Sequence, residues 1–220
     1  MAAPKKRSAS TTVSARSTLR RYAEKRDFSQ TPEPAGKKAG AGRSLRYVIQ
    51  KHRASRLHYD FRLEADGVLK SWAVPKGPSL DPAERRLAMQ VEDHPLDYRD
   101  FEGIIPAGNY GAGEVIVWDR GTYILAEGSD PSAEIGRGKI KFVLKGRKLS
   151  GMFTLVRMRP RDGSQNAWLL IKDTDAGADP DWSADDHAES VKSGRTLDDI
   201  AGNKRAKQWI SNRPAAGKRR

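Results

Sequence analysis

Short apolar runs separated by glycine and aspartate turns fill the middle of the chain. Residues 57–63 alternate apolar and polar side chains, residues 68–74 form a second apolar run, and the Asp66-Gly67 pair between them is typical of a tight hairpin turn. Many short strands with no long helical period predict an all-β domain closed into a barrel or a sandwich. Further strands are expected at 45–50, 86–92, 113–118, 122–126, 139–144, 152–158 and 167–172, with turns at 119–121 and 146–151.

The two ends of the chain differ from this middle part in amino-acid composition. Residues 1–44 are rich in small, polar and basic side chains, which predicts a disordered basic N-terminal tail with at most a short helix near 17–26. The β domain is expected at 45–175. Residues 176–220 are expected to hold an acidic loop, a short helix over 196–209 capped by Thr196, and a basic C-terminal tail.

Positive charge is concentrated in these ends. The 220 residues carry a formal net charge of +13. Residues 1–46 hold 12 basic and 3 acidic residues and 187–220 hold 9 and 3, whereas 47–186 hold 20 and 22. Basic tails of this kind either bind a phosphate backbone through counterion release or only improve solubility. We expect them to add nucleic-acid affinity, and we expect their deletion to leave the fold and chemistry intact.

The absence of cysteine limits the chemistry that the chain can perform. It excludes a disulfide-stapled scaffold, a thiol nucleophile, a cysteine-ligated zinc site and an iron–sulfur cluster, so His, Asp, Glu or backbone oxygen must hold any metal. The sequence has no apolar run near the roughly 20 residues that span a bilayer, and its N-terminus has no apolar core of a secretory signal. We therefore expect a soluble intracellular protein with a polyanionic partner and no membrane association.

A polar set on the strand at 57–63 is the first candidate site. Strand alternation places His58, Asp60 and Arg62 on one face. His52, expected on a loop just before this strand, would add a second imidazole, and two imidazoles with a carboxylate suit a divalent transition metal. The planar guanidinium of Arg62 can bind two phosphoryl oxygens at once. The alternative is a surface ladder in which Asp60 only pairs with Arg62.

A second polar cluster surrounds His94. This histidine is a candidate phosphate ligand, general acid or additional metal contact, and Tyr98 is a candidate hydrogen-bond donor to a phosphoryl oxygen. The glycine-rich run at 106–113 could bring backbone amides to a phosphate, although hairpin geometry explains it equally well. It lacks the Gly-Lys-Ser/Thr of a Walker loop.

These segments together resemble a known family, the 3′-phosphoesterase domain of bacterial ATP-dependent DNA ligase D. The similar region covers about residues 45–173. Its most specific motifs are Gln50-Lys51-His52, Leu57-His58-Tyr59-Asp60-Phe61-Arg62-Leu63-Glu64, the run from Gly67 to Pro78, and Val91-Glu92-Asp93-His94-Pro95-Leu96-Asp97-Tyr98.

The resemblance implies a small closed β-barrel and a manganese-dependent enzyme of DNA repair and non-homologous end joining. Such an enzyme removes a 3′-terminal ribonucleoside and then the remaining 3′-phosphate, which leaves a 3′-OH. The positions that match the family's metal ligands are His52, His58 and Asp60. The positions that match residues engaging the phosphate or needed for activity are Arg62, His94, Tyr98, Arg86 and Glu92, with a weaker role for Lys76.

The resemblance also implies partners: DNA or RNA-tipped DNA 3′ ends, with a DNA ligase and a Ku-type end-binding protein as further candidates. We expect a bacterial cytoplasmic monomer held near the nucleoid by DNA. Because the sequence has no Lys-x-Asp-Gly motif, we expect a stand-alone phosphoesterase that serves end joining or another repair of 3′ ends. Two alternatives are a non-catalytic adaptor that binds nucleic-acid ends and an unrelated small-molecule metalloenzyme.

Overall fold

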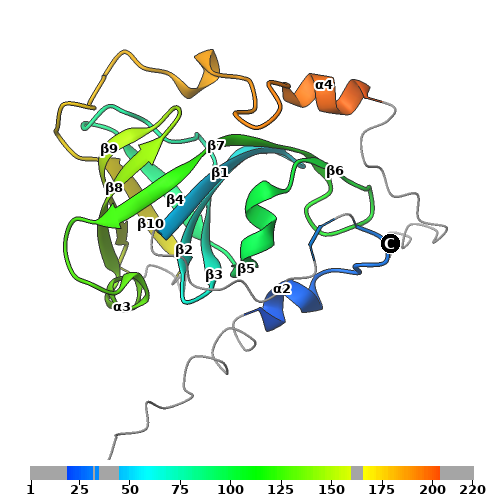
Figure 1. The fold of residues 1–220 in the computed structure, drawn as a ribbon, viewed down its shortest axis with the longest axis horizontal. Helices are drawn as coiled ribbons and strands as arrows, with labels where there is room; N and C mark the ends of the chain where they lie inside the picture. The colour runs from blue at the N-terminus through cyan, green and yellow to red at the C-terminus, as the bar shows by residue number, and fades with distance from the viewer. Residues whose placement is uncertain (1–18, 32, 35–44, 160–165, 204–220) are drawn as a thin grey trace, which may run out of the picture.

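Eight antiparallel strands form a closed barrel in the computed structural model (Figure 1). The structure describes residues 19–31, 33–34, 45–159 and 166–203. An additional pairing between the strands at Leu45–Arg53 and Gly113–Leu125 closes the ring, so the all-β barrel expected from the sequence is confirmed. Around the barrel the order is β1 (Leu45–Arg53), β2 (Leu57–Ala65), β3 (Val68–Val74), β4 (Arg85–Gln90), β10 (Ala167–Lys172), β9 (Ser150–Arg157), β8 (Lys139–Gly146) and β7 (Gly113–Leu125).

The turn between β2 and β3 is the one that its Asp-Gly pair predicts. Asp66 and Gly67 both have positive φ angles, 50° and 75°, which a two-residue hairpin turn needs to match the twist of its strands. The predicted hairpin of β8 and β9 and the last predicted strand, β10, are also present.

The turn predicted at 119–121 is wrong, because β7 runs unbroken through it. The carboxylate of Asp119 is buried and accepts hydrogen bonds from three backbone amides of the turn between β8 and β9. A side chain at Gly121 would place its Cβ 2.0 Å from the carbonyl oxygen of Lys145. Asp119 and Gly121 suggested a turn, but the structure needs them for the close pairing of β7 with β8 and for the turn that follows β8.

A second layer covers the outer face of the barrel wall formed by β3, β2, β1 and β7. It consists of β5 (His94–Pro95), the 3-10 helix η1 (Leu96–Asp100) and β6 (Gly103–Ile105). Because β5 pairs with β3 and β6 pairs with β7, this segment crosses the outer face of β2 and β1. A separate hydrophobic core fills the space between the two layers, and β2 is buried on both faces.

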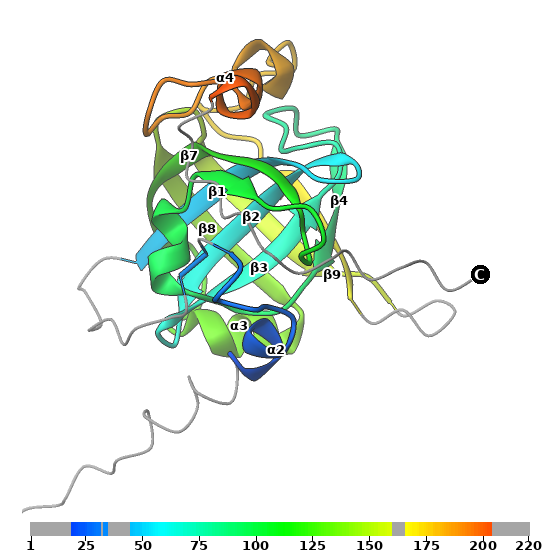
Figure 2. The ribbon, with the colours of Figure 1, turned by 90° about the vertical axis from the view of Figure 1, so that its right-hand side faces the viewer.

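Four short helices complete the described fold: α2 (Arg20–Glu24), α3 (Pro131–Arg137), η2 (Ala184–Asp186) and α4 (Leu197–Gly202). Leu197 and Ile200 of α4 join the core of the barrel, and in two perpendicular views α4 and α2 lie at opposite ends of the molecule (Figures 1 and 2). Thr196 caps α4 as predicted, while the predicted extension to 209 passes beyond the described residues.

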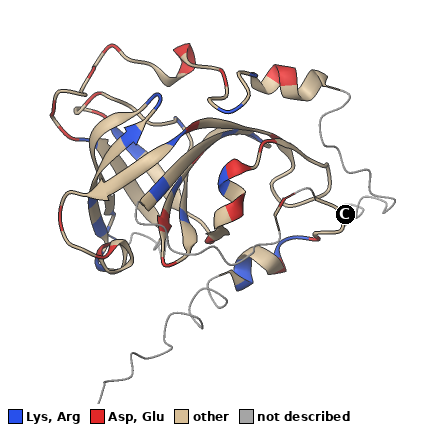
Figure 3. Cartoon of the chain, viewed as in Figure 1, with Lys and Arg blue, Asp and Glu red and all other residues tan. Residues whose placement is uncertain are grey.

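Both charge signs are interspersed over the barrel strands, and acidic residues mark η2 and α4 (Figure 3). No helix in the described part of the chain is long and apolar enough to cross a membrane. The two basic tails lie largely outside the described residues.

Candidate metal centre

The hairpin of β1 and β2 brings two histidines and an aspartate to one face. His52 pairs directly with His58, and Gln50 pairs with Asp60, so all four side chains project from the outer face of the barrel. Phe61 points the other way, into the core of the barrel, as the alternation predicts. The expectation that His52 lies on a loop is wrong, because hydrogen bonding to both β2 and β7 extends β1 through this polar stretch.

Three ligand atoms converge between these side chains. One oxygen of Asp60 lies 3.5 Å from Nδ1 of His52, and the other lies 3.7 Å from Nε2 of His58. All three ligand atoms lie within 4.8 Å of one another. These separations are longer than ordinary hydrogen bonds and leave room for a cation bound to all three groups.

Backbone carbonyls fix the tautomers of both imidazoles. Nε2 of His52 lies 2.9 Å from the carbonyl oxygen of Gly111, and Nδ1 of His58 lies 2.9 Å from that of Arg56. Since a carbonyl can only accept, each of these nitrogens carries the proton. The opposite nitrogen of each ring faces Asp60 and would offer its lone pair to a cation bound between them, which is how outer hydrogen bonds orient metal-bound histidines. The residues present fit a divalent cation.

Asp60 is an ionised carboxylate in this setting. Its burial acts to raise its pKa, but the Arg62 guanidinium and the ring of His52 outweigh this effect and hold the pKa below its usual range. Asp60 and Arg62 are buried, with 7% and 2% of their surfaces exposed. The alternative of a surface ladder is therefore wrong, although the two residues do form an ion pair of 3.1 Å.

The guanidinium of Arg62 is largely occupied by protein contacts. Nε donates to Gln50, Nη1 donates to Ser71, and Nη1 also lies 2.9 Å from Nδ1 of His94. With Nη2 on Asp60, the contacts to described residues leave at least one N–H of Nη2 for a ligand. The expectation that Arg62 binds two phosphoryl oxygens at once stays a prediction, and such binding would require some of these contacts to open.

Gln50 and Ser71 are site residues that the sequence analysis missed. Besides accepting from Arg62, the amide of Gln50 donates to the carbonyl oxygens of Tyr98 and Phe101 in and after η1, so it fixes the second layer to the barrel. The position of Gln50, two residues before His52 on the same face of β1, is the signal that could have identified it.

His94 lies at the start of the second layer and is only 3% exposed. Its two ring nitrogens lie beside two guanidinium groups, at 2.9 Å from Arg62 and 3.2 Å from Arg26. Burial, together with these two positive charges, lowers the pKa of His94 well below its usual value. The ring is therefore neutral at neutral pH.

Tyr98 and Glu92 line the same cavity as the metal candidates. Burial raises the pKa of Tyr98 well above its usual range, so its phenol remains a hydrogen-bond donor. Burial also acts to raise the pKa of Glu92, but hydrogen bonds from its own backbone and from Lys25 prevail and lower it. Glu92 is thus an anion, paired with Lys25 at 3.0 Å and Arg26 at 3.3 Å.

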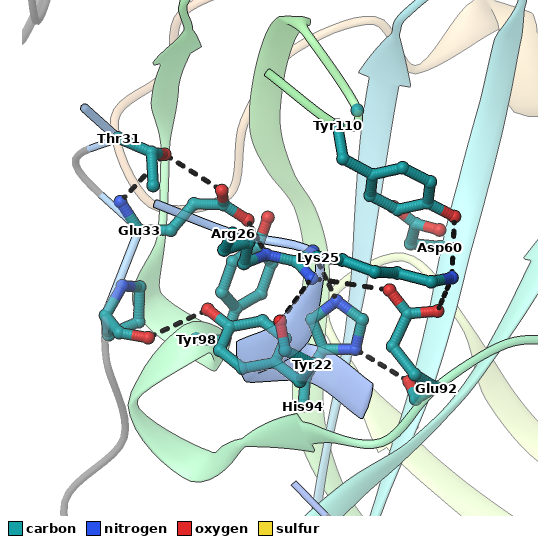
Figure 4. Close-up of polar contacts among 12 residues, drawn as sticks. Tyr22, Lys25, Arg26, Thr31, Glu33, Asp60, Glu92, His94, Tyr98 and Tyr110 are labelled. Carbon is teal, nitrogen blue, oxygen red and sulfur yellow. Dashed lines mark hydrogen bonds and ion pairs between the residues drawn. The ribbon is translucent and has the colours of Figure 1, made fainter. Parts of the chain in front are cut away.

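The described part of the N-terminal segment, residues 19–31 and 33–34, packs over this cavity (Figure 4). The ring of Tyr22 lies 4.9 Å from that of His94, and Arg26 bonds Glu33 at 2.7 Å while it reaches His94 and Glu92. The prediction of a disordered tail is therefore wrong for these residues, whereas the short helix considered near 17–26 is present as α2. Their low apolar content concealed Tyr22 and the buried ion pairs that hold the segment in place.

Other predicted positions lie at or beyond the edge of the cavity. Arg86 does not line it: its guanidinium contacts Glu84 and the carbonyl oxygen of Lys76. The run at 106–113 contributes the carbonyl of Gly111 to His52, and an approach of its amides to a phosphate stays a prediction. The cavity itself, called the metal cavity below, has a volume of about 290 Å³ and is lined by His52, His58, Asp60, Arg62, His94 and Tyr98, among others.

Comparison with known proteins places this site in context. Residues 50–157 match the family model of the DNA ligase D 3′-phosphoesterase domain. The multifunctional non-homologous end joining protein LigD of Pseudomonas aeruginosa is 60% identical over 162 residues, which cover 73% of this chain and 19% of that protein. The corresponding DNA repair protein LigD of Mycobacterium tuberculosis is 49% identical over 140 residues, which cover 63% of this chain and 18% of that protein. The chain thus spans about a fifth of the length of these relatives.

Proposed function

Residues 50–157 of this chain belong to the DNA ligase D 3′-phosphoesterase family, and from this premise we propose that the protein is a manganese-dependent enzyme that trims DNA 3′ ends. It would first cleave the phosphodiester that attaches a terminal ribonucleoside and then hydrolyse the remaining 3′-phosphate. The products would be a ribonucleoside, inorganic phosphate and a 3′-OH end.

The observation that carries this proposal is the pair of tautomer-fixed histidines facing Asp60. His52, His58 and Asp60 would hold the cation, because each offers one ligand atom and these atoms lie within 4.8 Å of one another. When bound there, a divalent ion would polarise a phosphoryl oxygen and offset its charge.

Two donors of the chain are available to orient the scissile phosphate. The free N–H of Arg62 Nη2 lies on the Asp60 side of its guanidinium, and the protonated phenol of Tyr98 lines the same cavity. Both would hydrogen bond to phosphoryl oxygens and stabilise charge that grows in the transition state. Gln50 and Ser71 would keep the guanidinium of Arg62 in place.

His94 is assigned the proton transfer to the leaving oxygen. Its neutral ring cannot donate an acidic proton while the positive charges of Arg62 and Arg26 dominate its surroundings. A bound phosphoryl group is anionic and would offset those charges, which raises the pKa of the imidazole toward the range of a useful general acid. Glu92 would contribute by holding Arg26 and Lys25 at the cavity.

The remaining assignments extend this proposal. Arg86 is proposed to act in the phosphomonoesterase step from outside the metal cavity. We propose a barrel domain at 45–175 with basic flanks, a monomer in the bacterial cytoplasm, and a role in end joining beside a DNA ligase and a Ku-type end-binding protein. The relatives are named for non-homologous end joining, which supports that role.

The test is incubation of the chain with a 5′-labelled primer–template that ends in one ribonucleotide, with Mn²⁺ or with EDTA. We expect a primer shortened by one nucleoside that carries first a 3′-phosphate and then a 3′-OH, and no product in EDTA. An adaptor that only binds ends would leave the primer intact in both conditions.

A further inference from the structure

A larger cavity, of about 570 Å³, opens beside the metal cavity. We call it the polar groove; it is lined by Arg21, Lys25, Lys70, Asp93, Tyr110 and Asn166, among others. The two cavities share Val91, Glu92 and Tyr110 as lining residues, so they adjoin along this boundary.

Lys25 lines the polar groove and contacts two of the residues that both cavities share, Glu92 and Tyr110 (Figure 4). Its ammonium group donates to Glu92 at 3.0 Å and to the hydroxyl of Tyr110 at 3.2 Å. Tyr110 is half exposed, so part of its ring is free to contact a ligand. A polymer that places one group in the metal cavity would have its next unit beside this boundary.

The charges of the polar groove leave one cation without a partner. Lys25 pairs with Glu92, and Lys70 pairs with Asp93 at 2.7 Å. Arg21 is exposed and forms no ion pair with any residue that the structure describes. The groove therefore favours an anion, and Arg21 is the group that is free to bind it.

We propose that the polar groove holds the nucleotide on the 5′ side of the scissile phosphate, with Arg21 bound to that nucleotide's own phosphate and Tyr110 stacked on a base. Guanidinium groups bind phosphate oxygens well, and exposed aromatic rings stack on bases of single strands without regard to sequence. The terminal ribonucleoside, which leaves without a phosphate, has no group for Arg21. This subsite rests on the proposed function, because it assumes a scissile phosphate in the metal cavity.

The first test compares Arg21→Ala with Arg20→Ala as a matched control. Arg20 is the neighbouring residue on α2, is paired with Glu24 at 2.7 Å, and does not line the groove. Binding of a fluorescent ribonucleotide-ended primer–template is measured by anisotropy in EDTA, so that no turnover is needed. We expect affinity to fall about 5-fold to 10-fold for Arg21→Ala and to stay within twofold for Arg20→Ala. Equal affinities for the two variants would overturn the proposal.

The second test removes the charge from the substrate instead. A neutral methylphosphonate replaces the phosphate one nucleotide 5′ of the scissile phosphate. We expect this change to weaken binding to the wild type and to Arg20→Ala about 5-fold to 10-fold, with no further loss for Arg21→Ala, because the two changes remove the same contact. Independent losses from the two changes, or no loss in the wild type, would overturn the assignment of Arg21.

The third test assigns the occupant of the groove. A primer that ends in a 3′-phosphate has the 5′ nucleotide but no terminal ribonucleoside, so the Arg21→Ala loss should persist with it. A loss seen only when the ribonucleoside is present would assign the groove to the leaving group and overturn the proposal.

Tyr110→Phe should bind normally, whereas Tyr110→Leu should weaken binding several-fold through lost stacking.

Failure of the subsite and failure of the proposed function give different results. If the wild type cleaves the ribonucleotide-ended primer while Arg21→Ala binds normally, only the subsite is wrong. If the wild type leaves the primer intact with Mn²⁺ present, the proposed function is wrong, and the subsite falls with it.

Discussion

His52 and His58 face each other as a directly paired couple across the hairpin of β1 and β2, with ring centroids 4.8 Å apart. Each ring uses one nitrogen on a backbone carbonyl and turns the other toward Asp60. Strand register thus places three electron-pair donors around one point, and the carbonyls fix which atoms they present.

Metal binding should therefore depend on Asp60. Asp60→Asn keeps the shape of the side chain but removes its charge, and we expect it to abolish the rise in melting temperature that Mn²⁺ gives the wild type. At a free Mn²⁺ concentration 100 times the Kd, that rise corresponds to about 2.7 kcal/mol of stability. Thermal unfolding with Mn²⁺ and with EDTA measures it.

Asp97→Asn serves as the matched control, because Asp97 is exposed on η1. This variant should keep the full response to Mn²⁺. An undiminished response in Asp60→Asn would show that Asp60 is not a ligand.

Arg62 should not tolerate replacement by lysine. The guanidinium contacts Gln50, Ser71 and Asp60 from three different nitrogens. An ammonium group on a flexible stem cannot make these three contacts at once. We expect Arg62→Lys to lower kcat about 30-fold to 1000-fold, equivalent to about 2–4 kcal/mol of transition-state stabilisation, while Mn²⁺ binding persists.

Steady-state kinetics on the ribonucleotide-ended primer checks this prediction, with Arg85→Lys on the exposed side of β4 as control. Turnover of Arg62→Lys within threefold of the wild type would mean that Arg62 supplies only positive potential.

Alternation along a single strand was enough to group part of the site. His58, Asp60 and Arg62 share a face because side chains on a strand repeat every two residues, and this needs no tertiary information. The same rule failed for His52, because the polar residues around it interrupt the apolar pattern although two neighbouring strands hold that stretch in the sheet. The end of β1 is set by its hydrogen bonds to β2 and to β7, and β7 is distant in sequence.

Contacts between segments far apart in the chain could not be predicted in this way. Arg26 reaches His94 across 68 positions, and nothing in the local composition around Arg26 indicates that it will be buried in ion pairs. Likewise, the three residues at 119–121 have the composition of a turn, but their role in pairing β7 with β8 emerges only from the closed barrel.

Turnover should require the described part of the N-terminal segment, from residue 19 onward, but not residues 1–18. Deletion of residues 1–34 removes Tyr22 and Arg26, and loss of the charge-assisted contacts to His94 and Glu92 should lower kcat about 10-fold to 100-fold. Deletion of residues 1–18 should leave kcat within about twofold and weaken DNA binding, with a shallower dependence of affinity on salt.

Arg26→Ala in the full chain separates loss of this side chain from loss of the segment. It should reproduce most of the fall in kcat. Equal kcat for the wild type and both deletions would contradict a role for the segment in the site.

Lys148 should make stability depend on pH. Its ammonium group donates to the carbonyl oxygens of His187 and Glu189, and burial lowers its pKa from 10.5 to about 8. Between these pH values the unfolded chain binds a proton that the folded chain has released, so this group makes the free energy of unfolding rise with pH. Urea unfolding at pH 7.5 and pH 10 measures the effect.

Between pH 7.5 and pH 10, the free energy of unfolding of the wild type should rise by about 1 kcal/mol more than that of Lys148→Met, after allowance for solvent screening. Lys145→Met, at an exposed position on β8, should follow the wild type. A gain equal in all three proteins would assign the pH dependence to other groups.

If His52, His58 and Asp60 form the metal centre of a 3′-end phosphoesterase, cleavage must depend on both Mn²⁺ and Asp60. The most direct measurement follows a 5′-labelled primer–template with one 3′-terminal ribonucleotide on a denaturing gel, with Mn²⁺ present. The wild type should convert it stepwise to the 3′-phosphate and then to the 3′-OH, and Asp60→Asn should leave it intact. An intact primer with the wild type, or equal cleavage by Asp60→Asn, would contradict this metal centre.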